Sequence, residues 1–431
     1  MSFKSAPLPR LLLAASASCL ALACASSEPV DKSTAPVGDI EIFSWWVSGG
    51  EVDALNALLA VHHDHYPETQ VKNLAEDLAE QARDRLEQRM SDGLPPSTFQ
   101  ANIGADLFKW VLFNGTDDAD SKVEPLNDLA EANGWFDTFP QPVIDALSYE
   151  GTLYGVPANI HRNNALFYSK AVFEQAGLTP PATREELLQI SAELKDAGYT
   201  ALCIGSEHWW TLQLLAFENV FPSVAGADFY QRYWAGDAAP DSTEVAATLD
   251  YLNELWPYFN ADANALSWTG GIDHMFDTES PCAMTVMGDW AKGYLESKGW
   301  KAGVDFDQIP FPGSNGTFVF TADTFPLPKG APNRAGALAL LETVGSIEGQ
   351  IAFNVIKGSI PVRTDMEPSE FDSVAQNTMR EFASDRLVMA LSGVMPQGSF
   401  QDLGPAIKEM LGSNSKEGVL NVLANDYSAL K

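Results

Sequence analysis

The sequence predicts an α/β protein, because strand-like and helix-like segments alternate along most of its length. Short apolar runs such as residues 40–43 are typical of strands, and the segment after Glu51 repeats apolar residues with the spacing of a helix. With 431 residues, the chain is long enough for two domains that each have a core. This alternation favours largely parallel sheets covered by helices.

The remaining elements are expected in the following order. Residues 74–90 have the composition of a polar helix, and Thr98-Phe99-Gln100-Ala101 has that of a buried strand. Thr183 and Glu186 predict a capping box at the start of a helix that ends near Gly198. Further strands are expected at residues 201–204, 281–284, 285–288 and 317–320, and helices after Phe400 and after Lys416.

Residues 1–23 are predicted to be a signal peptide rather than part of the fold. Lys4 and Arg10 precede an apolar run, Leu11 to Ala23, that is too short to span a bilayer. The run ends in small residues directly before Cys24, which resembles the lipobox of bacterial lipoproteins. That resemblance implies that Cys24 is lipidated and becomes the new N-terminus. Soluble secretion after cleavage nearby is the alternative.

The polar residues 24–38 then form a flexible tether. Removal of residues 1–23 takes away two basic residues and no acidic one, so 24 basic and 58 acidic residues leave a charge of −34. A surface of this sign excludes nucleic acid and anionic lipid as partners held through phosphate contacts. Membrane contact is therefore expected only through the lipid anchor.

Cys203 and Cys282 are the cysteines that remain after Cys24, and each lies in a predicted buried strand. In an oxidising compartment they could form a disulfide if the two strands are neighbours. Two free buried thiols are the alternative. We predict no metal site: His62 and His65 could share a helical face, but no further Cys or His cluster completes a set of ligands. No cofactor is implied.

Adjacent Trp45 and Trp46 directly follow the first predicted strand. Neighbours on an extended chain point to opposite sides, so one indole can face the core while the other is available to a ligand. A flat apolar ring with one N–H donor suits the face of a sugar. Burial of both rings in a core is the alternative.

Seven stretches, taken in order, resemble one family, the extracellular solute-binding proteins of bacterial ABC sugar importers. Within it the chain is most similar to the glucose/mannose-binding proteins, through the double Trp, Asn159-Ile160-His161-Arg162 and Gly288-Asp289-Trp290. The stretches are residues 42–46, 95–100, 154–163, 165–170, 180–183, 286–290 and 357–363.

The resemblance implies a fold of the periplasmic-binding-protein type. Two discontinuous α/β lobes enclose a ligand cleft and are hinged by crossing strands. The N-terminal lobe is expected to comprise residues 39–156 and 311–357, and the C-terminal lobe residues 157–310 and 358–431. Val156-Pro157 and Pro310-Phe311-Pro312 are rigid extended links of the kind that a hinge requires.

The resemblance also implies a sugar site made of aromatic faces and hydrogen-bonding side chains. Asp289 is the leading polar candidate, because it follows a glycine at a strand end. The tryptophan candidates from the resemblance are Trp45, Trp46, Trp268 and Trp290. Trp209-Trp210, which follows the loop signal of residues 205–208, is a further candidate for the cleft lining. The polar candidates are Glu51, Gln100, Asn102, Asn159, His161, Asp289, Asp323, Lys357 and Ser392.

Two positions depart from the glucose/mannose pattern, since Asn102 and Ser392 stand where histidines are expected. We therefore predict a receptor for a monosaccharide such as glucose, mannose or galactose, with a disaccharide or another sugar as the alternative. The resemblance implies a monomer at the periplasmic or extracytoplasmic face that docks on an ABC permease in the inner membrane, with no catalytic residues. A glycosidase or lyase that uses Glu51, Asp289 and Asp323 is the rival class of protein, and an adhesion scaffold is a third.

Overall fold

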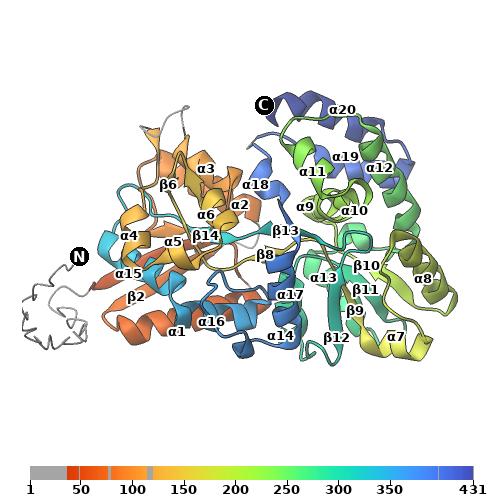
Figure 1. Ribbon diagram of the computed structural model, residues 1–431, viewed down its shortest axis with the longest axis horizontal. Coiled ribbons are helices and arrows are strands. Elements are labelled where there is room, and N and C mark those ends of the chain that lie inside the picture. The colour runs from red at the N-terminus through yellow and green to blue at the C-terminus, as the bar shows by residue number, and fades with distance from the viewer. Residues whose placement is uncertain (1–35, 48, 76–78, 114–119, 397, 431) are drawn as a thin grey trace, which may run out of the picture. The chain divides into compact units, whose positions relative to one another are not determined.

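The computed structural model describes residues 36–47, 49–75, 79–113, 120–396 and 398–430 (Figure 1). The predicted signal peptide, Cys24 and most of the predicted tether lie outside these residues. Within them, no helix is both long and apolar enough to cross a membrane.

The first sheet has the strand order β2-β1-β3 and is parallel. It is formed by β1 (Gly38–Ser44), β2 (Thr69–Ala75) and β3 (Thr98–Phe99). The helix predicted for residues 74–90 is wrong at its start, because β2 ends at Ala75 and α2 covers only Ala79–Ser91. All seven residues of β2 pair with β1, and mainly polar side chains suit this edge strand.

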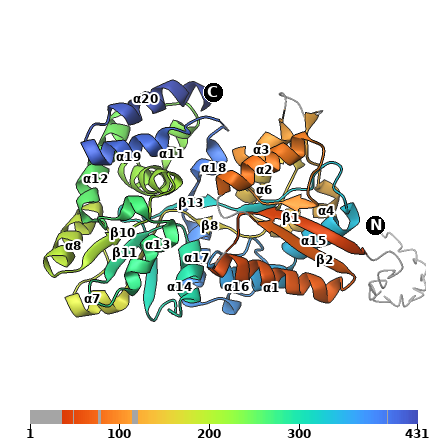
Figure 2. The same cartoon turned by 180° about the vertical axis from the view of Figure 1, so that it is seen from behind.

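Helices α1 (Gly49–His65) and α16 (Ile347–Lys357) pack against each other and run side by side in both views (Figures 1 and 2). They contribute to a first hydrophobic core that takes side chains from residues 40–160 and from residues 318–382. Distant parts of the chain therefore build one lobe. Its other elements are α3 (Ala105–Val111), α4 (Asn127–Ala132), α5 (Trp135–Thr138), α6 (Gln141–Leu147), β5 (Ser148–Tyr149), β6 (Thr152–Leu153), α15 (Arg334–Gly345) and α17 (Ser373–Ser384).

A second lobe surrounds a four-stranded sheet of order β10-β11-β9-β12. Its strands are β9 (Ala165–Ser169), β10 (Thr200–Cys203), β11 (Cys282–Val286) and β12 (Phe306–Pro310). Two adjoining cores lie within residues 165–311, and one of them also takes side chains from residues 319 and 388–427. The predicted capping box is confirmed, since Thr183 and Glu186 bond reciprocally at the start of α8 (Arg184–Asp196).

The helices of the second lobe follow the predicted alternation only in part. Leu214–Val220 is a π-helix inserted between α9 (Trp210–Gln213) and α10 (Phe221–Ala225). The others are α7 (Lys170–Ala176), α11 (Ala227–Trp234), α12 (Thr243–Leu255), α13 (Trp268–Asp273), α14 (Trp290–Ser297), α18 (Leu391–Val394), α19 (Leu403–Ser413) and α20 (Glu417–Asp426).

A three-stranded sheet of order β15-β13-β8 joins the two lobes. In β13 (Thr317–Thr321), Phe318 and Phe320 pack in the first core and Val319 packs in the second. The sheet thus presents one face to each core, as the two-residue repeat of a strand dictates. Its other strands are β8 (His161–Arg162) and β15 (Arg386–Met389).

Outside the parallel first sheet, the strand pairs are mainly antiparallel, so the sheets are not largely parallel as the sequence predicted. β14 (Asp323–Phe325) runs antiparallel to β4 (Ala101–Asn102) and to β7 (Val156–Pro157). β9 is antiparallel to both of its neighbours.

The limits drawn from the sequence for the two lobes stay a prediction. Ile360, Val362 and Phe382 contribute to the first core.

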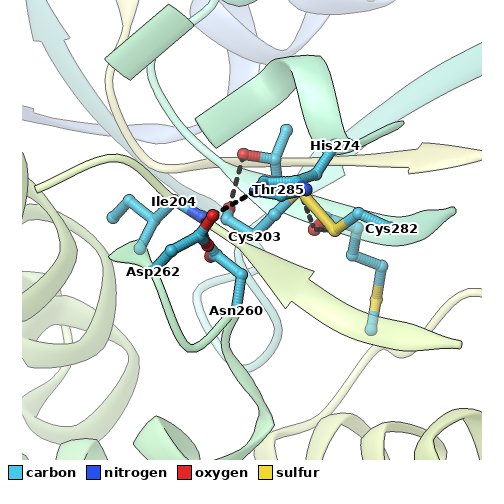
Figure 3. Close-up of a disulfide and its surroundings, with 8 residues drawn as sticks. Cys203, Ile204, Asn260, Asp262, His274, Cys282 and Thr285 are labelled. Atoms are coloured by element: carbon cyan, nitrogen blue, oxygen red, sulfur yellow. Dashed lines mark hydrogen bonds and ion pairs between the residues drawn. A yellow bond between two sulfur atoms is a disulfide. The ribbon is translucent and has the colours of Figure 1, made fainter. Parts of the chain in front are cut away.

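Cys203 and Cys282 are joined by a disulfide in the structure, with their Cα atoms 6.1 Å apart (Figure 3). The bond is sterically accessible because β10 and β11 are adjacent parallel strands, in which Thr200 pairs with Cys282 and Cys203 pairs with Thr285. Both cysteines are fully buried. The condition of neighbouring strands, left open by the sequence, is therefore met.

Candidate functional site

A cleft of about 850 Å³ is lined by residues of both lobes. Five half-buried tryptophans line it: Trp45 from the first lobe and Trp209, Trp210, Trp268 and Trp290 from the second. Most of the predicted site residues belong to its lining. They are Trp45, Trp46, Glu51, Asn102, His161, Trp210, Trp268, Trp290, Asp323, Lys357 and Ser392.

Trp45 and Trp46 have opposite environments, as expected for neighbours on an extended chain. Trp46 is only 1% exposed and packs on Phe325 and Phe353. Trp45 is half-buried, and the guanidinium of Arg83 lies 4.5 Å from its ring centroid. A cation on one face of the indole stabilises this orientation. Trp45 is therefore the member of the pair that is more exposed to the cleft.

The tryptophans of the second lobe share a local design, because Trp210, Trp268 and Trp290 are each the first residue of a helix. This position follows a turn, so the ring can project from the protein surface into the cleft. The ring of Trp290 lies edge-on to His161, with centroids 5.2 Å apart, and 6.2 Å from the ring of Trp210. Gly288 permits this placement, since a Cβ there would lie 2.1 Å from a Trp290 ring carbon.

A buried polar network lies beneath these rings and centres on His161. The Nδ1 atom of His161 contacts the carboxylate of Asp289, and its Nε2 atom lies 3.0 Å from Oδ2 of Asp323. The three residues are at most 4% exposed. They come from β8, from the turn before α14 and from β14, so the network joins segments of both lobes.

Gln100 and Asn159 complete the network by holding Asp323. The side-chain amide of Gln100 donates to Oδ1 of Asp323 at 2.7 Å, and that of Asn159 donates to Oδ2 at 2.8 Å. Gln100, Asn159 and Asp289 do not line the cleft. For Asp289, the leading candidate from the sequence, the structure shows support instead: it binds His161 and accepts the backbone N–H of Arg162 at 2.9 Å.

Burial and neighbouring charges shift the pKa values of His161 and Asp323 in opposite directions. Burial would lower the pKa of His161, but Asp289 and Asp323 outweigh it and raise that pKa above the ordinary 6.5. Burial would raise the pKa of Asp323, but His161, Lys357 and Asn159 lower it to about 2. Asp323 is therefore a carboxylate at neutral pH and can accept hydrogen bonds from a ligand.

Glu51 and Lys357 form a second charged pair in the lining, with 2.6 Å between Oε1 and Nζ. Glu51 lies in the first turn of α1, where an acidic residue suits the helix dipole. Lys357 ends α16 and is followed by Gly358 in the left-handed conformation. Lys357 is 2% exposed and sits over the ring of Trp46, so it is not a solvated lysine.

The two residues that depart from the family pattern also line the cleft. Asn102 lies on β4, opposite Asp323 of β14. Ser392 lies in α18, and its hydroxyl is 3.3 Å from the hydroxyl of Thr321. In Asn102 and Ser392, small polar side chains thus stand where imidazoles were expected.

Trp268, another residue of the lining, packs edge-on against Tyr294, with 5.4 Å between the ring centroids.

Sequence reasoning missed several residues of the lining. Trp209 is not among them, because the loop signal before Trp209-Trp210 pointed to both residues of the pair. Arg83, Glu87, Asp106 and Lys109 on α2 and α3 had no distinguishing pattern. Asn163 and Glu218 also line the cleft, and Glu218 had no signal because it belongs to the π-helix.

The histidine-rich end of α1 forms no metal site. Within the described part of the chain, no group of three or more His, Cys, Asp or Glu residues could hold a metal ion. His62 is buried between the hydroxyls of Thr343 and Thr69, each 3.0 Å away. Burial and the neighbouring histidines lower its pKa to about 4, so His62 is neutral at pH 7. It serves packing.

Comparisons with known proteins agree with this architecture. Residues 79–351, more than half of the chain, match the model of the family described as bacterial extracellular solute-binding protein. The chain is 29% identical over 392 residues to an ABC transporter extracellular-binding protein of Pyrococcus horikoshii, covering 88% of this chain and 85% of that one. It is 27% identical over 363 residues to a probable sugar-binding periplasmic protein of Rhizobium meliloti, covering 84% of each.

A solved structure shares the fold. The bacterial solute receptor AcbH, described as having an exclusive preference for β-D-galactopyranose, superposes with a TM-score of 0.78 at 17% identity. The match covers 91% of this chain and 98% of that one. At this identity the likeness bears on the two-lobed α/β fold alone.

Proposed function

Because the chain belongs to the bacterial extracellular solute-binding proteins, we propose that it is the sugar-binding component of an ABC importer. The observation that carries this proposal is a cleft lined by five half-buried tryptophans above a buried, ionised Asp323. Indole faces stack on the C–H patches of a sugar ring, and a carboxylate accepts hydrogen bonds from its hydroxyls. The relative from Rhizobium meliloti, named as sugar-binding, supports the same ligand class.

The ligand class that we propose is a small sugar, and a monosaccharide such as glucose, mannose or galactose is the candidate that the sequence resemblance favours. His161, Asp323 and the Glu51–Lys357 pair lie in one region of the cleft lining and supply both donors and acceptors. A disaccharide is the second candidate. A cleft of about 850 Å³ lies near the upper end of the range of small-molecule sites, roughly 300–1,000 Å³, and so favours the larger ligand.

The mechanism that we propose is capture without chemistry. The lobes close on the sugar, and the ligand stabilises the closed form by as much as it binds that form better. A glycosidase acid would require a raised pKa, whereas the pKa of Asp323 is lowered to about 2. This opposes Asp323 as the general acid.

We further propose that the protein is exported, anchored by a lipid on Cys24 at the periplasmic or extracytoplasmic face, and monomeric. The closed form would dock on a permease in the inner membrane and release the sugar. Gln100, Asn159 and Asp289 would act by holding His161 and Asp323, and the lining tryptophans would contact the sugar.

A titration of tryptophan fluorescence tests the proposed function. The chain without residues 1–24 is titrated with glucose, mannose, galactose, xylose, maltose, cellobiose and lactose. We expect a saturable change with one sugar class at micromolar concentration, and recovery of that sugar unchanged after prolonged incubation. No response from a folded sample would contradict sugar binding, and appearance of a cleaved product would contradict capture without chemistry.

A further inference from the structure

Glu218 is a buried carboxylate of the cleft lining that the His161 network does not use. It is 5% exposed, and no Lys, Arg or His side chain of the described residues lies within ion-pair distance of it. Its Oε2 atom accepts from the side-chain amide of Asn163 at 2.7 Å. Its Oε1 atom accepts from the backbone N–H of Leu391, also at 2.7 Å.

The π-helix from Leu214 to Val220 sets the position of this carboxylate. Short π-helical turns are rare and are frequently found at functional sites. The side chain of Asn219 donates to the backbone oxygens of Leu214, at 3.0 Å, and Asn163, at 3.2 Å. Two successive residues of the π-helix thus bind Asn163, which follows β8, and fix Glu218 against the cleft.

Glu218 has unused acceptor capacity. A carboxylate offers about four lone-pair sites, and the two observed hydrogen bonds occupy two of them. Burial raises the pKa of Glu218, while its bonds to Asn163 and Leu391 lower it in part. A glutamine at this position could accept the same hydrogen bond from the backbone N–H of Leu391 without the free-energy cost of burying a charge. A hydroxyl that donates to Glu218 would offset that cost, whereas an acceptor on the ligand would be repelled.

Glu218 shares no hydrogen bond with the His161 network and is held instead by Leu391 and by Asn163, two residues after His161. His161 and Asn163 are two residues apart on an extended segment, so they lie on the same side of it and about 7 Å apart. Arg162, between them, points to the opposite side and binds Glu381 and Asp385. Thr321 and Ser392 also line the cleft, and Ser392 directly follows the Leu391 that binds Glu218.

We propose that Glu218, oriented by Asn163 and Leu391, is a specificity-determining residue that accepts a hydrogen bond from a hydroxyl of a second sugar unit. The first unit contacts Asp323 and His161, and His161 lies about 7 Å along the extended chain from Asn163, which orients Glu218. The preferred ligand is then a disaccharide or a longer sugar that carries a hydroxyl donor on this second unit. The inference rests on the proposed sugar-binding function and deepens it.

Glu218→Gln and the matched control Glu254→Gln test the proposal. Glu254 is an exposed residue of α12 and does not line the cleft. Calorimetry measures the affinity of each variant for the monosaccharides and disaccharides named above, and a thermal melt confirms folding. For the disaccharide that the wild type prefers, we expect affinity to fall by about tenfold or more with Glu218→Gln, because the sugar hydroxyl loses its carboxylate acceptor. We expect a change of less than twofold with Glu254→Gln.

Monosaccharide affinity, where the wild type has any, should change less than twofold with Glu218→Gln. If that variant melts well below the wild type, Glu218→Asp replaces it, because it keeps the charge and withdraws the carboxylate by one methylene. Unchanged disaccharide affinity, an equal loss for both sugar classes, or a wild type that binds monosaccharides only would each overturn the role of Glu218 and leave the proposed function standing. A wild type that binds no sugar would overturn both.

Discussion

Trp45 and Trp46 show how one step along an extended chain gives identical side chains different tasks. Trp46 is buried against Phe325 and Phe353, while Trp45 is half-buried and flanked by Arg83. The sequence expectation that one indole faces the core is confirmed. The reason is the two-residue repeat of a strand, which requires no knowledge of the rest of the fold.

Trp290 is the residue for which a single substitution separates binding from packing. It is half-buried and contacts the rings of His161 and Trp210. We expect Trp290→Ala to weaken sugar binding by about 30-fold or more, the loss typical of an aromatic hot spot of ~2 kcal/mol. The melting temperature should fall by only a few degrees. Calorimetry and a thermal melt provide the two measurements.

Trp290→Phe is the matched control, because it retains a ring and should keep most of the affinity. If Trp290→Ala binds sugar normally but melts well below the wild type, Trp290 is a packing residue and the assignment of the site is wrong.

At the scale of elements, the joining sheet and the π-helix carry most of the site. Successive side chains of β13 pack in two different cores, and β8 carries His161 two residues before Asn163. The π-helix then brings Glu218 against Asn163. Neither arrangement follows from local propensity, because each depends on a partner more than fifty residues away in the chain.

The pairing of β10 with β11 makes the disulfide a stability element of the second lobe. It closes a loop of 79 residues and lies in a core against which Trp210, Trp268 and Trp290 also pack. We expect Cys203→Ala together with Cys282→Ala to lower the free energy of unfolding by about 2–5 kcal/mol. Denaturant unfolding of the purified, oxidised protein measures this loss.

Reagent access provides the control for the disulfide. Because both cysteines are fully buried, the wild type should react with a thiol reagent only after unfolding and reduction. Reaction of the unfolded but unreduced protein would show free thiols. A double variant as stable as the wild type would contradict the role of the bond in stability.

At the scale of the whole molecule, polar networks connect segments that belong to different cores. Asp289, His161 and Asp323 form one of them. Behind the joining sheet, the fully buried Arg162 binds Glu381 and Asp385 at the C-terminal end of α17. Lys292 of α14 binds Asp372 at the other end of α17, at 2.6 Å. The relative position of the lobes thus depends on buried charges.

The His161 network predicts how stability depends on pH. Its two aspartates raise the pKa of His161, so the stabilisation is fully present below the ordinary value of 6.5 and is lost as pH rises through the raised value. The pKa of Asp323 is lowered to about 2, so its contribution is present above the ordinary 3.8 and is lost as pH falls through about 2. Maximum stability from this network is therefore expected between about pH 4 and pH 6.5.

Melting curves of the wild type and of His161→Asn between pH 4 and pH 10 test this dependence. At pH 5 to 6 the variant should be less stable by about 3 kcal/mol, because it leaves two buried carboxylates without their partner. This difference should shrink as pH rises above 6.5. A difference that stays constant up to pH 10 would show that His161 carries no charge in the folded protein.

The sequence alone determined the α/β class, the strands β1, β3, β10, β11 and β13, the capping box at Thr183 and the part of the cleft lining that carries the family motifs. These depend on local periodicity, on short-range hydrogen bonds and on motifs that stay contiguous in the chain. It missed the edge strand β2 and extended the following helix into the last two residues of that strand. Its leading polar candidate, Asp289, does not line the cleft. Tertiary structure decided that Asp289 supports His161, that Glu218 faces the cleft and that Cys203 meets Cys282. Each of these depends on which distant segments become neighbours, and burial and charge at those contacts arise only once the chain is folded.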